Sequence, residues 1–340
     1  MLPNTKVISI IGAGWYGCHL ALSFLKRGYE VHIFEKNSHI FSESSGINQN
    51  RLHLGFHYPR CSKTRNQSRR GYRLFSNSYK SIIKRLDMCI YAVPYIGSIL
   101  DFTTYVSIMK SSNLYFEDVT NALPFSLNGI EGALDCEEAL IDFNEAKKLF
   151  EGELDHLIKY NTCISFDDCR RMASSNHLVL DCTWNKIVPN DRYFYEVALM
   201  FRYDHVHRIN IGLTLVDGEL FSIYPYDDNS SSVSHVKYTP ILRCDNPQDA
   251  YKFLLENQQN AFDSIRKKIE KSIQIFFPKF NKYYINPTPL LSIKTKTTLN
   301  YISSRATYIE SNSDSFYSVH AGKIDTIFDT EHLVLELLEG

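Results

Sequence analysis

The segment that most constrains the fold lies within the first 35 residues. A β-branched run, Lys6–Ile11, leads directly into Gly12-Ala13-Gly14-Trp15-Tyr16-Gly17, a G-x-G-x-x-G pattern. The apolar residues of Cys18–Arg27 recur at helical spacing, and Tyr29–Phe34 has the composition of a second strand, which ends at Glu35. Strand, glycine turn, helix, strand and terminal acid follow one another in the order of a Rossmann-type dinucleotide-binding unit.

Each of these residues has a physical reason to be there. Gly12 permits a tight turn, Gly14 lets the backbone approach a pyrophosphate, and Gly17 lets the helix pack close to the strand. The pyrophosphate then lies at the helix N-terminus, where free N–H groups and the helix dipole favour an anion. The Glu35 carboxylate can accept hydrogen bonds from ribose hydroxyls, and an acid at this position disfavours NADP. The unit alone does not distinguish NAD from FAD.

Composition limits the other classes of function. The chain has 340 residues, 44% of them hydrophobic, and a formal charge of -1, which suits a soluble protein of about two packed units. A nucleic-acid binder needs a surplus of Lys and Arg that this chain lacks. The eight cysteines form no C-x-x-C pair and no zinc-ligand spacing, so we expect no metal and a reducing, cytoplasmic location. Polar residues and glycines interrupt the apolar start, so no membrane span is expected.

The stretch after Glu35 favours one cofactor. Ser44-Ser45-Gly46-Ile47-Asn48-Gln49-Asn50-Arg51-Leu52-His53 resembles the second flavin-binding motif of the D-amino-acid-oxidase-like family of FAD-dependent oxidoreductases. Ser44, Ser45 and Asn48 occupy matching positions, whereas Asn50 replaces the usual small residue. Hydroxyls and amides here can bind the pyrophosphate and the ribityl chain as neutral donors. We therefore expect FAD.

Two later segments extend the resemblance. His177–Trp184 is similar to the family strand that closes on an A-T-G motif, with Thr183 at the Thr position. Phe316–Thr326, followed by a helix through Leu338, is similar to the family's C-terminal end, although His320-Ala321-Gly322-Lys323 replaces the usual G-H-G turn. The resemblance implies that this turn lies beside the isoalloxazine ring. The helix dipole and Lys323 would then stabilise negative charge on the reduced flavin.

The resemblance covers the whole chain in order, and it implies an α/β (α+β) fold. A Rossmann-like FAD-binding domain is expected to be discontinuous, over residues 1–75, 142–192 and 296–340. An interleaved antiparallel-sheet substrate domain is expected over residues 76–141 and 193–295, with a strand meander in 195–242 and one long helix over 246–277. In finer detail the chain resembles an uncharacterised bacterial branch of the family.

The residues expected to hold FAD come from four segments. These are the G-x-G-x-x-G fingerprint with the acid that follows it, the polar loop Ser44–Asn50 with the residues next to it, the turn at Thr183, and the C-terminal turn around His320–Lys323. They are Gly12, Gly14, Trp15, Tyr16, Gly17, Glu35, Lys36, Ser44, Ser45, Asn48, Asn50, Arg51, Leu52, Thr183, Gly322, Lys323 and Ile324.

Candidate catalytic residues lie in three places. His53 and His57, with Tyr58 and Arg60, follow the polar loop and are expected near the ring. The predicted meander carries Tyr224, Tyr226, His235 and Tyr238, and His235 could serve as a general base or as a hydrogen-bond donor. Arg305 lies where family members often carry a carboxylate-binding arginine, and it is either such a ligand or a surface residue. The catalytic set is therefore His53, His57, Tyr224, His235 and Arg305.

We expect an FAD-dependent oxidoreductase that oxidises a C–N or C–OH bond of a small polar substrate by hydride transfer to flavin N5, with an amino acid or amine favoured. One alternative is a flavoenzyme that acts on an amino sugar or a nucleotide sugar, either by oxidation or in a reaction without net oxidation. The other is an FAD-binding protein without catalysis. The partner is a small molecule in each of the catalytic cases, and the sequence leaves the oligomeric state open.

Overall fold

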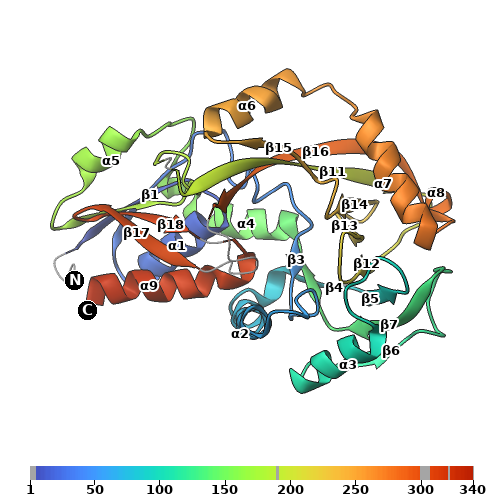
Figure 1. Ribbon diagram of the computed structural model, residues 1–340. Helices are drawn as coiled ribbons and strands as arrows, with labels where there is room; N and C mark the ends of the chain where they lie inside the picture. Colours follow the sequence, from blue (N-terminus) through green and yellow to red (C-terminus); the bar gives the residue numbers. More distant parts are fainter. Residues whose placement is uncertain (1–4, 189–190, 299–306, 321, 340) are drawn as a thin grey trace.

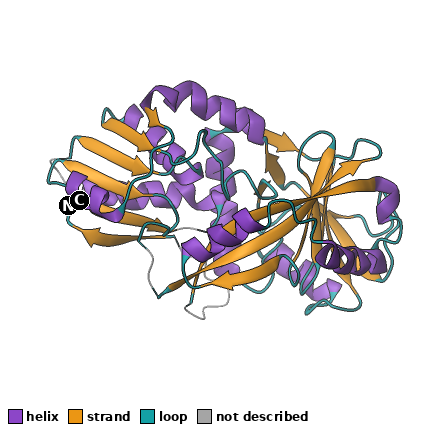
Figure 2. Cartoon of the chain, turned by 90° about the horizontal axis from the view of Figure 1, so that it is seen from above, coloured by secondary structure: helices purple, strands orange, loops and turns teal. Residues whose placement is uncertain are grey.

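A computed structural model describes residues 5–188, 191–298, 307–320 and 322–339. Two large β-sheets dominate this part of the chain, and they lie toward opposite ends of the molecule with helices packed beside each (Figures 1 and 2). Arg305, one of the predicted site residues, lies outside the described residues.

The first sheet has the Rossmann-like arrangement that the fingerprint predicts. Its strands are all parallel except the edge strand β17, which is antiparallel to its neighbour β18. Segments far apart in the sequence therefore meet in one sheet. In spatial order the strands are β17 (Tyr308–Ser313), β18 (Phe316–His320), β10 (His177–Asp181), β1 (Val7–Ile11), β2 (Glu30–Phe34) and β9 (Ile158–Lys159).

Helices cover both faces of this sheet. On one face, apolar residues of the sheet and the helices form a buried core that includes Ile8, Leu20, Phe24 and Phe150. Each such side chain contributes roughly 1.5–3 kcal/mol by leaving water. The helices with residues in this core are α1 (Trp15–Lys26), α2 (Ser62–Ser78), α4 (Phe143–Leu154) and α9 (Ile327–Glu339), while α5 (Phe166–Met172) packs against β10 on the other face.

Gly17 sets the distance between helix α1 and strand β1. A Cβ atom at this position would lie 1.9 Å from the carbonyl oxygen of Gly12. Any side chain would therefore push α1 away from the glycine turn, which is the packing role that the sequence predicts for the third glycine.

The second sheet is mixed. Strands β11 and β16 pair antiparallel along most of their length, and β12 pairs with β5 in parallel. From the long strand β11 (Tyr193–His205) the sheet continues in the order β14 (Ser230–His235), β13 (Phe221–Pro225), β12 (Ile211–Leu215), β5 (Met88–Pro94), β7 (Ile130–Cys136) and β6 (Phe116–Asp118). The strand β15 (Pro240–Cys244) pairs with the same edge of β11 as β14, nearer the start of β11, and β16 (Tyr284–Thr297) pairs with the opposite edge. The expected meander is thus present, with one parallel neighbour.

A small third sheet places the segment after the polar loop. It consists of β3 (Arg51–Leu52), β8 (Ala139–Ile141) and β4 (Ile83–Arg85). Because β3 pairs antiparallel with β8, Arg51 and its neighbours lie next to the start of β8.

The single long helix expected over residues 246–277 is wrong. The structure has two helices, α6 (Pro247–Glu256) and α7 (Asp263–Phe276), because the polar run Asn257-Gln258-Gln259-Asn260 interrupts the apolar pattern and Phe262 adopts a φ of +50°. The remaining helical segments are α3 (Phe102–Ser111), α8 (Phe280–Tyr283) and the 3₁₀ turns Lys80–Ile82, Asp155–Leu157 and Ile324–Thr326. Among the described helices, none combines the length and the apolar character needed to cross a bilayer.

Candidate active site

One cavity receives residues from both large sheets. Its volume is about 1380 Å³, which exceeds the roughly 300–1,000 Å³ of a pocket for a drug-sized ligand. The glycine turn, the polar loop and the C-terminal turn line one side, and strands β11, β13, β14 and β16 contribute to the other. The cavity is therefore large enough for a dinucleotide together with a second molecule.

Most of the predicted site residues line this cavity. They are Gly12, Gly14, Trp15, Tyr16, Glu35, Lys36, Ser44, Ser45, Asn48, Asn50, Arg51, His53, His57, Thr183, His235, Gly322, Lys323 and Ile324. Three others do not line it. Gly17 lies beneath the glycine turn, Leu52 is fully buried in the core, and Tyr224 is buried behind the wall.

The N-terminus of helix α1 forms an anion cradle. The backbone N–H of Trp15 donates to the Ser45 hydroxyl at 3.2 Å, and the first turn of α1 contains no acidic residue. No acidic residue of the helix itself therefore competes for the partial positive charge of its N-terminus, which suits a pyrophosphate. A Cβ atom at Gly14 would lie 2.9 Å from Oγ of Ser45, so glycine keeps this cradle open.

Glu35 is held where a ribose is expected. Its buried carboxylate accepts hydrogen bonds from the backbone N–H of Ala13 at 2.8 Å and from the backbone N–H of Asn37 at 2.9 Å. These bonds tie the end of β2 to the glycine turn. The carboxylate thus lines this end of the cavity in a fixed orientation.

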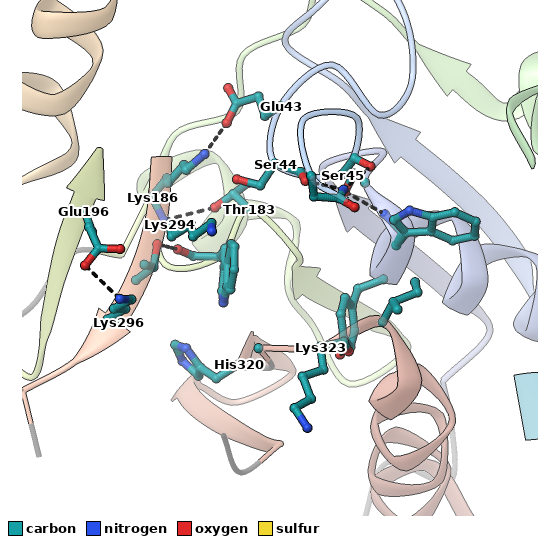
Figure 3. A pocket seen from close by; sticks show the side chains of 18 of the residues that line it. Glu43, Ser44, Ser45, Thr183, Lys186, Glu196, Lys294, Lys296, His320 and Lys323 are labelled. Atoms are coloured by element: carbon teal, nitrogen blue, oxygen red, sulfur yellow. Dashed lines mark hydrogen bonds and ion pairs between the residues drawn. The ribbon is translucent and has the colours of Figure 1, made fainter. Parts of the chain in front are cut away.

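A charged cluster joins the two sheets beside this end of the cavity. The Glu43 carboxylate accepts hydrogen bonds from the Tyr251 hydroxyl of α6, at 2.8 Å to each oxygen, and pairs with Lys36 at 2.5 Å and with Lys186 (Figure 3 shows the Lys186 pair). Burial alone would raise the pKa of Glu43, but the two lysines overcome this effect and lower it to about 2. Glu43 therefore stays ionised and fixes both lysines on the cavity wall.

The C-terminal turn lies against the fingerprint. The Tyr16 hydroxyl donates to the backbone carbonyl of Lys323, and Nζ of Lys323 lies 3.0 Å from Oγ of Ser68 and 3.6 Å from the ring centre of Tyr58. The neighbouring Asp325 is buried, and its carboxylate has no hydrogen-bond partner among the described residues. An unpaired buried carboxylate is costly, so a ligand in the cavity would stabilise this turn.

The deepest ion pair in the wall is centred on Glu138. Its carboxylate is buried and accepts hydrogen bonds from the Tyr91 hydroxyl at 2.6 Å and from the backbone N–H groups of Leu54 at 2.8 Å and Gly55 at 3.3 Å. Glu138 was not among the predicted residues. The acidic pair Glu137-Glu138 has the local appearance of an exposed turn, and only the apolar run Ala139–Ile141 after it signals burial.

Glu138 connects two predicted residues, Arg51 and His53. One carboxylate oxygen lies 3.4 Å from Nδ1 of His53 and 3.7 Å from Nη2 of Arg51. Burial alone would raise the pKa of Glu138, but His53 and Arg51 lower it to about 2. Burial, followed by the charge of Arg51, lowers the pKa of His53, so this histidine is neutral at neutral pH. A neutral imidazole in a cavity can accept a proton.

The other predicted catalytic residues have different surroundings. His57 stacks on His53 with ring centres 5.6 Å apart, and Tyr58 packs edge-on against both rings. Both nitrogens of His235 are engaged, Nε2 with Ser272 at 2.9 Å and Nδ1 with the backbone N–H of Lys237 at 3.1 Å, and burial lowers its pKa to about 4.

Three tyrosines of the meander contribute to the structure around the cavity. The Tyr224 hydroxyl lies 2.9 Å from Oγ1 of Thr214, and its ring lies under the guanidinium of Arg51. Tyr226 donates to the carbonyl of Gly46 at 3.2 Å, and Tyr238 packs against His235. Near the polar loop, Arg60 pairs with Asp217.

The fold and the cavity define an FAD-dependent oxidoreductase, and comparisons with known proteins agree. Residues 10–75 match the family of NAD(P)-binding Rossmann-like domains. The chain is 32% identical to the FAD-dependent monooxygenase FPY4 of Fusarium mangiferae over 99% of this chain and 92% of FPY4, and 23% identical to the FAD-dependent monooxygenase kojA of Aspergillus flavus over 97% and 85%. The chain belongs to the same family of FAD-dependent enzymes as FPY4. These relatives are fungal, so the expected bacterial branch is not supported.

Solved structures give the same fold. Glycine oxidase from Geobacillus kaustophilus superposes with a TM-score of 0.70 at 12% identity, covering 98% of this chain and 95% of that one. L-α-glycerophosphate oxidase from Mycoplasma pneumoniae, with FAD bound, superposes with a TM-score of 0.71 at 14% identity, covering 99% and 95%. The fold expected from the D-amino-acid-oxidase-like resemblance is therefore confirmed.

Proposed function

We propose that this enzyme oxidises a C–OH or C–N bond of a small polar substrate, with His53 as the base that accepts the proton of the hydroxyl or amine. The observation that carries this proposal is the neutral His53 imidazole on the cavity wall, backed by the Glu138 carboxylate 3.4 Å from its Nδ1. Nδ1 faces Glu138, so Nε2 is the nitrogen left for the substrate.

The proposed step is balanced between the cofactor and the protein. Bound FAD supplies an acceptor for two electrons, received as a hydride from the substrate carbon. His53 takes the O–H or N–H proton, and the carbon becomes a carbonyl or an imine. Glu138 then stabilises the imidazolium by its charge, as a carboxylate behind a catalytic histidine does in other enzymes. Residues of strands β11, β13, β14 and β16 line the same cavity, and with FAD and substrate bound they would help to keep water away from the reacting groups.

The residues proposed to hold FAD are those of the cradle and the two turns. Gly14, Ser45 and the N-terminus of α1 would bind the pyrophosphate, and Glu35 would bind the ribose. Gly322, Lys323 and Ile324 would lie beside the ring, as the family resemblance implies. The discontinuous domain boundaries predicted from the sequence also belong to this proposal.

The test is anaerobic mixing of the flavin-loaded protein with a panel of hydroxy acids, sugars, amines and amino acids. The visible flavin band should bleach with at least one of these compounds. His53→Gln should keep its FAD and bleach about 10²–10⁴ times more slowly. Equal bleaching rates in the two proteins would remove His53 from the mechanism.

A second function, monooxygenation, is supported by the names of FPY4 and kojA. A monooxygenase places one atom of dioxygen in its product and reduces the other to water, which requires two electrons from a separate donor. Product formed under ¹⁸O₂ separates the two functions, because hydride oxidation alone incorporates no label from dioxygen.

A further inference from the structure

The cavity is more cationic than the protein around it. The whole chain has a formal charge of -1. Of the described residues that line the cavity, eight are Lys or Arg and four are Asp or Glu. Such a concentration of positive charge in a concave surface attracts anions. The FAD cradle lies at the N-terminus of α1, and several of these cations lie elsewhere.

Strand register places three of the cations on one face of the second sheet. Glu196 of β11 is opposite Arg243 of β15 on one side and opposite Lys294 of β16 on the other. Residues directly opposite in a sheet point to the same face. Two residues along the strands, Lys296 lies opposite Phe194 and shares this face. All five residues line the cavity.

We call these five residues the roof face, and its contacts form a flat, charged surface. Nζ of Lys296 lies 2.7 Å from the Glu196 carboxylate, and the guanidinium of Arg243 lies 4.1 Å from the ring centre of Phe194. Arg243 and Lys296 are both exposed. In Figure 3, Lys296 and Glu196 lie on the opposite side of the view from Ser45 of the FAD cradle.

The size of the roof face indicates the kind of anion. Arg243 and Lys294 are two strand spacings apart, about 10 Å, and Lys294 and Lys296 are about 7 Å apart along the strand. These are backbone separations, and the long Lys and Arg side chains can bring their charges closer together. One carboxylate is bound by a single guanidinium fork, whereas the two adjacent phosphates of a diphosphate can accept hydrogen bonds from all three cations. The Arg243–Phe194 stack adds a flat surface against which a nucleobase can lie.

We propose that the roof face binds the diphosphate of a nucleoside diphosphate-containing molecule that enters the cavity beside FAD. This inference rests on the proposed function and names its ligand class. Two sources share this chemistry. The molecule is either a nucleotide-linked substrate, which the proposed hydride transfer to FAD oxidises, or a nicotinamide dinucleotide. In the second case the dinucleotide gives its hydride to FAD in the monooxygenase reaction, where dioxygen is the oxidant, and leaves in its oxidised form.

ADP binding to the flavin-loaded protein, measured by calorimetry, is the first test. Arg243→Met and Lys296→Met should each weaken ADP binding at least tenfold while FAD stays bound. Glu196→Gln should tighten ADP binding several-fold, because it removes the one carboxylate of the roof face. Lys282→Met, at an exposed lysine of α8 outside the cavity, is the matched control and should change nothing. Unchanged ADP binding in the first two variants, or their loss of FAD, would overturn the proposal.

Two further experiments show which of the two molecules binds to the roof face. Anaerobic bleaching of the flavin by NADH or NADPH, weakened in Lys296→Met, identifies the electron donor. Competition of ADP with the oxidised substrate, without bleaching by either dinucleotide, identifies a nucleotide-linked substrate. A protein that binds ADP here but oxidises no hydroxy or amino compound refutes only the proposed function. A protein that oxidises such a compound but binds no ADP refutes only this inference.

Discussion

The carboxylate of Glu138 lies 3.4 Å from Nδ1 of His53. The two residues are far apart in the sequence, and Glu138 directly precedes strand β8. The antiparallel pairing of β3 with β8 brings them together. This relationship fixes the orientation of the imidazole and makes its protonation depend on a buried carboxylate.

The pH dependence of flavin reduction should report this pair. Burial and Arg51 lower the pKa of His53, whereas Glu138 acts to raise it. The base is active when neutral, so the rate should be constant near pH 7 and fall as the pH drops through a value below 6.5. In Glu138→Gln this acid limb should move to lower pH, because the raising charge is lost. Stopped-flow measurement of flavin reduction across pH 4–8 gives the acid limb of the wild type and of the variant. If the limb lies at the same pH in both, Glu138 does not influence the protonation of His53.

Glu138 should also stabilise the fold. Its pKa is about 2, below its ordinary value of 4.5, so its contribution is complete above pH 4.5 and is lost as the pH falls toward 2. Glu138→Gln also takes a charged acceptor away from the Tyr91 hydroxyl and two backbone N–H groups, and losing such a buried partner costs about 1–3 kcal/mol. Urea unfolding at pH 7 should therefore show the variant to be less stable by about that amount, with a smaller difference at pH 3. Glu153→Gln, on an exposed part of α4, should change stability by less than about 0.5 kcal/mol.

Substitution at Gly14 should abolish FAD retention. A Cβ atom there would lie 2.9 Å from Oγ of Ser45, so Gly14→Val would displace the Ser45 hydroxyl and place its methyl groups in the cradle. Gly152→Val is the matched control, since no atom lies within 4 Å of a Cβ at that position. The flavin-to-protein absorbance ratio after purification should be near zero in the first variant and unchanged in the second. If the Gly14→Val protein retains its flavin, the G-x-G-x-x-G segment does not bind the cofactor.

The Glu43 cluster should slow the release of FAD. Tyr251 donates from helix α6 to a carboxylate on the polar loop, and hydrogen bonds to charged groups contribute about 1.5–3 kcal/mol. Tyr251→Phe should therefore release FAD roughly tenfold faster, as measured by the recovery of free-flavin fluorescence after dilution. Tyr95→Phe, at a tyrosine that is 70% exposed, serves as the control. Equal release rates would mean that the cluster does not close over the cofactor.

The sequence was sufficient for parts of the site that depend on local backbone requirements. Gly12 adopts a φ of +100° and Gly17 touches the Gly12 carbonyl, so the spacing of these glycines carries structural information by itself. The polar loop from Ser44 to Asn50 was found by its resemblance to a family motif a short distance after Glu35, and most of its predicted residues line the cavity.

Residues brought in by long-range pairing could not be found from the sequence. Glu138 reaches His53 only because β8 pairs with β3, and Lys294 lines the cavity only because β16 pairs with β11. Neither has a local signal that differs from that of a surface residue. For the same reason the sequence, which offered His235 as a general base or a hydrogen-bond donor, could not show that Ser272 and the backbone of Lys237 engage both of its nitrogens.

The most direct measurement is anaerobic, single-turnover reduction of the bound flavin in the wild-type and His53→Gln proteins. The proposed mechanism predicts full loss of the visible flavin band in the wild type with a hydroxy or amino compound. It also predicts a rate at least 100-fold lower in His53→Gln at equal FAD content. A flavin-loaded wild-type protein that no such compound reduces, or a variant that is reduced at the wild-type rate, would contradict it.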